Sequence, residues 1–221
     1  ACLSKGCIGT TSSGLVRLNA AFAPTAIATP PVAFGLAASG TDFLAMGPEP
    51  ARLSTTGVAT TFTYPAPLDH EHHVTAGSPA GFVSAFRKSS TGELFYVRYP
   101  ATGTTPTWPL AAVPGSTDLG PSGSRLALSG TRAMYLAAGA TAAQTFDTAT
   151  KPTLPFASVP FARTAPAHRG GAVASDGKDF LVGWIEDRAT GRELRVRRFD
   201  AKGAALGVST RAATLRSDEY G

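Results

Sequence analysis

The sequence predicts an all-β fold that is built from a repeated unit of four short strands. Glycine occurs 24 times and proline 17 times among the 221 residues, a frequency that long helices would not tolerate. Hydrophobic residues make up 43% of the chain, which excludes a disordered protein and suffices for one large domain or two small ones. Two short patterns of residues recur along the chain, and together they define the repeat.

The first pattern begins with alanine, has serine or aspartate third and glycine or proline fourth, and continues into an apolar run. Because glycine and aspartate accept turn dihedrals, each copy predicts a tight hairpin between two apolar strands. Successive copies begin about 40–50 residues apart. They are Ala37–Phe43, Ala76–Phe82, Ala127–Ala133 and Ala174–Phe180.

The second pattern places an arginine before a large apolar residue and a polar turn that often ends in glycine. It predicts a third strand that runs into another turn, and the residues after it supply a fourth, more exposed strand. The clear copies are Arg52–Gly57, Arg98–Gly103 and Arg198–Gly203. In the third repeat, Thr145–Thr150 takes this place without the arginine or the glycine, and a partial copy, Arg17–Ala20, stands near the N-terminus.

Four short strands in about 40–50 residues, repeated along a chain, are typical of β-propeller blades. A β-sandwich with accidental internal similarity and a β-helix are the alternatives, although the coils of a β-helix are shorter than this repeat. We expect an N-terminal segment over residues 1–13 and a half-blade over 14–28. About four four-stranded blades follow, over 29–67, 68–117, 118–164 and 165–216.

The repeat resembles one that is common in secreted bacterial proteins, especially surface proteins of myxobacteria. There an apolar strand ending in tryptophan precedes an acidic-x-Arg loop and a strand with the pattern Arg-apolar-x-x-x-Gly. The last repeat matches best, through Trp184, Glu186–Arg188, Arg198 and Gly203. The other repeats lack the acidic loop and carry Met46, Phe86 or Ala137 near the tryptophan position. The resemblance implies a propeller fold and says little about activity.

The expected half-blade lacks its two inner strands. An unclosed propeller would expose a bare sheet edge and an open core. We therefore expect the chain to be part of a larger ring, completed by further sequence or by a second polypeptide. A five-bladed ring needs the least addition, and six to eight blades are equally compatible with the sequence.

The charge pattern does not favour nucleic acid as a partner. The 20 lysines and arginines exceed the 15 acidic residues, giving a formal net charge of +5. They are scattered apart from Arg192, Arg195, Arg197 and Arg198, and basic residues along a strand project to alternate faces. A nucleic-acid footprint needs a contiguous basic patch. No apolar run approaches the about 18 residues of a transmembrane helix, so no transmembrane segment is expected.

The only two cysteines, Cys2 and Cys7, lie in one short N-terminal stretch. A local disulfide between them would close a small loop and would imply an oxidising compartment. This predicts an extracellular, periplasmic or cell-surface location. The alternative is that Ala1 and Cys2 are the remnant of a lipoprotein processing site, with a lipid on Cys2.

Three of the four histidines fall within Asp69–His73, and the fourth, His168, precedes Phe180 by the interval that separates His70 from Phe82. Both places correspond to the crossing between blades, on the rim that also carries the loop between the second and third strands. In an extended segment only His70 and His72 would share a face, so zinc would need His168 or a partner as a further ligand. A divalent metal at these three histidines is a hypothesis, and a solvated loop is the favoured interpretation.

We expect ligands to bind at this rim. The expected rim residues are His70, Glu71, His72, His73, Arg87, Lys88, Trp108, His168, Arg169, Glu186, Asp187 and Arg188. Trp184 ends an inner strand, and we expect it in the core instead. The sequence has no sialidase-type aspartate box, calcium loop, nucleophile elbow or phosphate-binding loop.

The favoured function is a binding or scaffold module that recognises protein or glycan through this rim. An extracellular hydrolase or lyase with the histidine-rich rim at its centre is the alternative from another class. A third interpretation is a structural subunit whose open edges are covered by neighbours. The sequence assigns no catalytic residue.

Overall fold

The computed structural model describes residues 2–3, 6–11, 14–18, 24–27, 35–47, 49–63, 70–88, 94–113, 125–136, 141–149, 157–161, 171–188 and 191–215. These ranges contain twenty strands and no helix, which confirms the all-β prediction. Nowhere in them does a helix occur that could cross a membrane. The chain divides into two compact units, residues 1–117 and 118–221.

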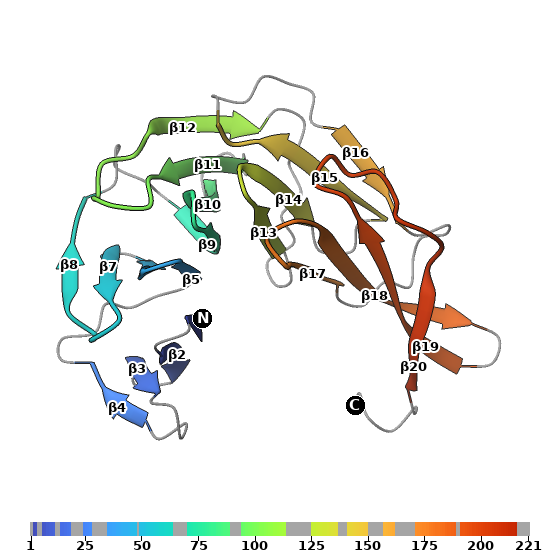
Figure 1. The fold of residues 1–221 in the computed structure, drawn as a ribbon, viewed down its shortest axis with the longest axis horizontal. Helices are drawn as coiled ribbons and strands as arrows, with labels where there is room; N and C mark the ends of the chain where they lie inside the picture. The colour runs from blue at the N-terminus through green and yellow to red at the C-terminus, as the bar shows by residue number, and fades with distance from the viewer. Residues whose placement is uncertain are drawn as a thin grey trace. The chain divides into compact units, whose positions relative to one another are not determined.

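The first unit holds three antiparallel sheets of four strands each, and the strands follow sequence order across every sheet (Figure 1). The first sheet consists of β1 (Cys2–Leu3), β2 (Gly6–Thr11), β3 (Gly14–Leu18) and β4 (Pro24–Ala26). The second consists of β5 (Gly35–Ser39), β6 (Asp42–Met46), β7 (Ala51–Ser54) and β8 (Ala59–Thr61). The third consists of β9 (His70–Ser78), β10 (Gly81–Lys88), β11 (Leu94–Tyr99) and β12 (Trp108–Val113).

The second unit holds two sheets of the same construction. The fourth sheet consists of β13 (Arg125–Ser129), β14 (Arg132–Leu136), β15 (Ala142–Asp147) and β16 (Ala157–Pro160). The fifth consists of β17 (Gly171–Ser175), β18 (Phe180–Arg188), β19 (Gly191–Phe199) and β20 (Thr210–Leu215). The second to fifth sheets fall within the four ranges that the repeats predict.

The N-terminal sheet has two more strands than the half-blade expected over residues 14–28. β1 and β2 add them from residues 1–13, a segment that the sequence pattern leaves outside the repeats. β1 is only two residues long and β2 is rich in glycine and threonine, so neither shows the apolar run by which the other strands are found. The pairing sets Cys2 directly opposite Cys7, and the bond between their sulfur atoms stays a prediction.

Strand register shows that the repeated patterns occupy the same place in each sheet. The alanine of the first pattern pairs with one residue of the second strand, and the arginine of the second pattern pairs with that same residue from the other side. The three-residue rows are Ala37, Leu44 and Arg52; Ala76, Val83 and Arg98; Ala127, Met134 and Thr145; and Ala174, Leu181 and Arg198. In the first sheet, Ile8 pairs with Arg17 in the equivalent way.

Consecutive sheets within a unit pack face to face. Because side chains alternate along a strand, each sheet has two faces. Within a unit, we call the face toward the preceding sheet the leading face and the face toward the following sheet the trailing face, and we use the same names for the equivalent faces of the other sheets. Phe43, Phe82 and Phe180 lie on leading faces, whereas Leu44 and Met134 lie on trailing faces. The core clusters join Ile8 with Phe43 and Leu53; Leu44 and Met46 with Phe82 and Tyr99; and Met134 and Leu136 with Phe180 and Trp184. Trp184 is buried, as predicted.

A glycine turn completes the contact between the fourth and fifth sheets. Gly203 has φ of +88°, in the left-handed region that favours glycine. A Cβ atom there would lie 2.6 Å from Val159 Cγ2 and 3.4 Å from Thr145 Cγ2. The turn therefore packs against the small threonine that stands where the other repeats carry arginine.

Candidate functional site

Two carboxylates face each other near one end of the fifth sheet. Glu186 of β18 pairs directly with Glu193 of β19. Glu186 is 6% exposed, and the Glu193 side chain is 12% exposed. Like charges directly opposite each other in a sheet are destabilising, so this pair requires positive partners.

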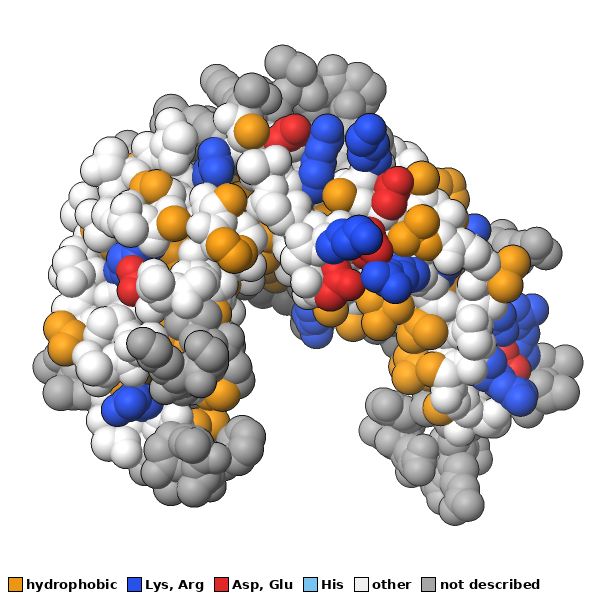
Figure 2. Space-filling model, in the orientation of Figure 1, with side chains coloured by type: hydrophobic (Ala, Val, Ile, Leu, Met, Phe, Trp, Pro, Cys, Tyr) orange, Lys and Arg blue, Asp and Glu red, His pale blue; other side chains and the backbone are white. Residues whose placement is uncertain are grey.

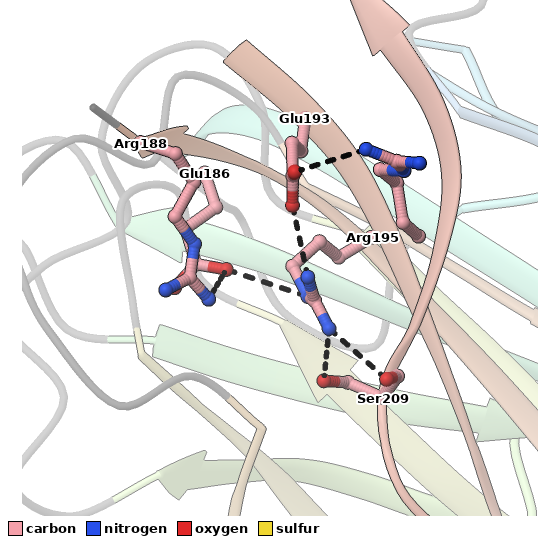
Figure 3. Close-up of polar contacts among 6 residues, drawn as sticks. Glu186, Arg188, Glu193, Arg195 and Ser209 are labelled. Carbon is pink, nitrogen blue, oxygen red and sulfur yellow. Dashed lines mark hydrogen bonds and ion pairs between the residues drawn. The ribbon is translucent and has the colours of Figure 1, made fainter. Parts of the chain in front are cut away.

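Arg195 lies between the two carboxylates (Figure 3). Its Nη1 donates to Glu193 Oε2 at 2.9 Å, and its Nε lies 3.4 Å from Glu186 Oε2 as an ion pair without hydrogen-bond geometry. Its Nη2 donates to the backbone oxygen and the hydroxyl of Ser209, at 3.0 Å each. One guanidinium thus connects β18, β19 and the residue before β20.

Two further arginines face solvent around this centre. Arg188 donates to Glu186 Oε2 at 2.7 Å, and Arg211 Nη1 lies 3.6 Å from Glu193 Oε1. Their side chains are 47% and 61% exposed. We call Glu186, Arg188, Glu193, Arg195 and Arg211 the ionic cluster. Each exposed guanidinium contacts one carboxylate of the cluster and keeps further N–H groups toward solvent, and such groups suit an anionic ligand.

Alternation along the strands explains where the cluster lies. Glu186 follows Phe180, Val182 and Trp184 on the leading face of β18, and the burial of β18 alternates accordingly. The first part of that face is apolar and packs against the fourth sheet, whereas its continuation is charged. The cluster is therefore anchored on a rigid strand pair beside a buried tryptophan.

Of the expected rim residues, Glu186 and Arg188 belong to the ionic cluster. Asp187 lies beside it, where its Oδ1 accepts a hydrogen bond from Arg192 Nε at 3.1 Å. The side chains of the remaining expected rim residues lie outside the described part of the structure, and so do His168 and Arg169 altogether. Glu193, Arg195, Ser209 and Arg211 were not among the expected rim residues.

The histidine segment differs from the expected crossing loop, because His70–His73 forms the first part of strand β9. The register pairs His70 with Lys88 and Glu71 with Arg87, and then shifts so that His73 pairs with Phe86. His72 is the extra residue of this bulge, so strict alternation does not hold across His70–His73. Alternation along the strand therefore does not place His70 and His72 on the same face of the sheet.

Metal binding at these histidines stays the less favoured hypothesis. No group of three or more His, Cys, Asp or Glu that could hold a metal ion occurs among the side chains that the structure describes. The predicted ligands His70, His72 and His168 are not among those side chains. The enzyme hypothesis, which depends on the same histidines, is likewise untested.

Charged side chains of both signs lie next to one another on the visible face of the molecule, with hydrophobic side chains scattered between them (Figure 2). On that face the positive charge does not form one continuous patch.

Comparison with solved structures identifies the fold. The chain is similar to a chain of a nidogen/laminin complex (TM-score 0.57, 14% identity), of which it spans 76% with 93% of its own length. It is also similar to a prolyl endopeptidase (0.54, 15%) and to a putative 6-phosphogluconolactonase from Bacteroides uniformis (0.53, 19%). For these two, 87% and 90% of this chain match only 30% and 64% of the other.

These structures are of the β-propeller type, so the predicted architecture is confirmed at the level of fold. No family model matches the chain, and no curated protein matches it in sequence.

Proposed function

We propose that this chain is a β-propeller module of a secreted or cell-surface protein, and that it binds a carboxylate-bearing protein or glycan at the ionic cluster. The carrying observation is that Glu186 and Glu193 hold the exposed guanidiniums of Arg188 and Arg211 at the end of one sheet. Arginines that are already positioned lose less side-chain entropy on binding a carboxylate. Glu186 and Arg188 are also among the rim residues that the sequence analysis names.

Two observations support the proposed location. The repeat resembles those of secreted bacterial proteins, and Cys2 lies opposite Cys7 in the first sheet. A disulfide between facing cysteines would fit an oxidising compartment. Antiparallel partners have Cα atoms about 4.5–5.5 Å apart, within the range that a disulfide spans.

The test measures binding to two polyanions that carry carboxylates, polygalacturonate as the glycan and polyglutamate as the polypeptide, with neutral dextran as the negative control. We expect one of the two to bind, with an affinity that falls as salt rises. The double substitution Arg188→Gln and Arg211→Gln should lower that affinity about tenfold, because it removes both exposed guanidiniums.

A matched control removes the same charge elsewhere. Arg125 and Arg132 lie in the hairpin strands β13 and β14 of the fourth sheet. Replacing both with Gln should leave binding nearly unchanged. Equal losses for the two double variants would indicate attraction by net charge alone, and absence of binding to either polyanion would overturn the proposal.

A further inference from the structure

The fourth strand of the fifth sheet differs from the fourth strands of the other sheets. We call the fourth strand of a sheet its outer strand. The outer strands β4, β12 and β16 contain Pro24, Pro109 and Pro160, and β8 has only three residues. Proline and short length both hinder further pairing at the edge of a sheet. β20 has six residues and no proline, so its edge suits an added strand best.

The free edge of β20 is accompanied by exposed side chains. β20 pairs with β19 along one edge, and none of the described strands pairs with its other edge (Figure 1). The side chains from Thr210 to Thr214 are all exposed, whereas Val159 of β16 is 4% exposed. Two features of β20 do limit pairing, a bulge like that of β12 and the charge of Arg211. A positive charge on an edge repels a basic strand and attracts an acidic one.

The other edge strands of the chain are poor partners for β20. The outer strands carry proline or are short, as described above, and β1 has only two residues. The inner edge strands β5 and β9 lie against each other, and so do β13 and β17, so neighbouring strands crowd their free edges. Each of these features belongs to the strands themselves. Neither unit therefore offers β20 a suitable partner among its described strands.

Charge distinguishes between the partners that remain. β18, β19 and β20 carry six arginines and three acidic residues, which leaves three positive charges on these strands. Pairing between the β20 strands of two copies of this chain would bring two such sheets together edge to edge. Because like charges repel, the edge favours an acidic polypeptide over a second copy.

Arg211 connects the ionic cluster with this edge. In the register it stands opposite Arg195, and its Nη1 lies 3.6 Å from Glu193 Oε1. Its side chain is 61% exposed. In an added strand, the residue opposite Arg211 would lie on the same face with its Cβ about 4.5–5.5 Å away. A carboxylate at that place would be within reach of the guanidinium.

We infer that the ligand of the ionic cluster is an acidic polypeptide that pairs as an extended strand with the free edge of β20. One of its carboxylates lies beside Arg211. The inference rests on the proposed function and narrows its ligand from protein or glycan to protein. In this mode of recognition, main-chain hydrogen bonds supply affinity and the side chains supply specificity. A glycan has no row of amide groups with which to pair.

The test uses a peptide about ten residues long in which glutamate and threonine alternate, so that its carboxylates lie on one face when it is extended. One version carries N-methyl groups on its glutamates and a second version carries them on its threonines. Both keep the charge of the parent peptide. Because successive residues of a strand direct their N–H groups to opposite edges, only one set of methyl groups would face β20.

One methylated version should therefore bind about tenfold more weakly than the parent peptide, and the other within about threefold of it. Hydrogen exchange gives a second readout on the unmodified chain. The parent peptide should slow exchange over residues 210–215, whose outward N–H groups gain partners. Residues 157–159 of β16 are the control, and their exchange should not change.

The possible failures separate the inference from the proposed function. If the parent peptide binds but the two methylated versions do not differ, or exchange in β20 does not slow, charge alone holds the peptide. That result would overturn the inference and leave the proposed function standing, and so would binding of polygalacturonate without binding of the peptide. Absence of binding to the peptide and to both polyanions would overturn the two together.

Discussion

The guanidinium carbon of Arg52 lies 5.2 Å from the centre of the Phe82 ring, although the two residues belong to different sheets. The same guanidinium donates to three backbone oxygens of the third sheet and pairs with Asp42 of its own. One side chain therefore joins two sheets through an ion pair, a ring contact and hydrogen bonds.

We expect Arg52→Met to lower the free energy of unfolding by about 3 kcal/mol, because it leaves Asp42 and the turn oxygens without their donor. Urea unfolding measures the change. Arg197→Met is the control, since Arg197 also lies over a ring, that of Phe199 at 5.5 Å, but within its own sheet. The control should cost about 1 kcal/mol or less, and equal losses would show that Arg52 does not join the sheets.

Gly77 lies where the third sheet touches the second. A Cβ atom at this position would lie 2.0 Å from the backbone oxygen of Ala38. Gly77→Ala should therefore force the sheets apart and cost about 1–3 kcal/mol in thermal or urea unfolding. At Gly183, another strand glycine, the nearest atoms to a Cβ are 3.8 Å away, so Gly183→Ala should cost little or stabilise slightly. Similar losses at both sites would contradict the packing argument.

Hydrogen bonds from the backbone of Asp179 and Lys178 lower the pKa of Asp176 below 3.8, and the charge of Arg198 adds a smaller effect. A depressed carboxyl pKa stabilises the fold above the unfolded value and loses that contribution as pH falls through the folded value. We expect an NMR titration of Asp176 to give a midpoint below 3.8. The substitution Arg198→Gln should leave most of the lowering of the Asp176 pKa. If the pKa of Asp176 returned to its ordinary value in this variant, the charge of Arg198 would be the main cause of the lowering.

The facing cysteines give a prediction on mass and stability. The native chain should be lighter than the reduced chain by two hydrogens, which intact mass spectrometry before and after reduction detects. Replacing Cys2 and Cys7 together by Ser should cost about 2 kcal/mol, the loop-closure value for so short a loop. Two free thiols in the native protein, detected by alkylation without reductant, would exclude the bond.

The sequence predicts sheet architecture well because the hairpin pattern carries both its turn and its apolar alternation within a few residues. Ala174–Phe180 is such a segment, and β17 and β18 pair as it predicts. The first sheet was only half predicted, since β1 offers two residues and no alternation. Local sequence has no signal for a strand whose stability comes from its neighbours.

The ionic cluster was predicted only in part, for a related reason. Glu186 and Arg188 stand in a motif that the resemblance picks out, whereas Arg195 becomes part of the cluster only through the β18–β19 register and the position of Ser209. The histidine segment illustrates the reverse, because alternation alone does not foresee the bulge at His72.

The contact between Thr145 and the Gly203 turn limits where one sheet of this chain could be exchanged for a sheet of another repeat. The residue that receives a turn lies on one sheet, and the turn lies on the next, so the matched pair straddles two sheets. Replacing one sheet as a whole, from its first to its fourth strand, would separate this pair. An arginine on the new sheet would then meet a turn that fits threonine, or a threonine would meet a turn that fits arginine. The transferable module therefore begins at the third strand of one sheet and ends after the third-strand turn of the following one.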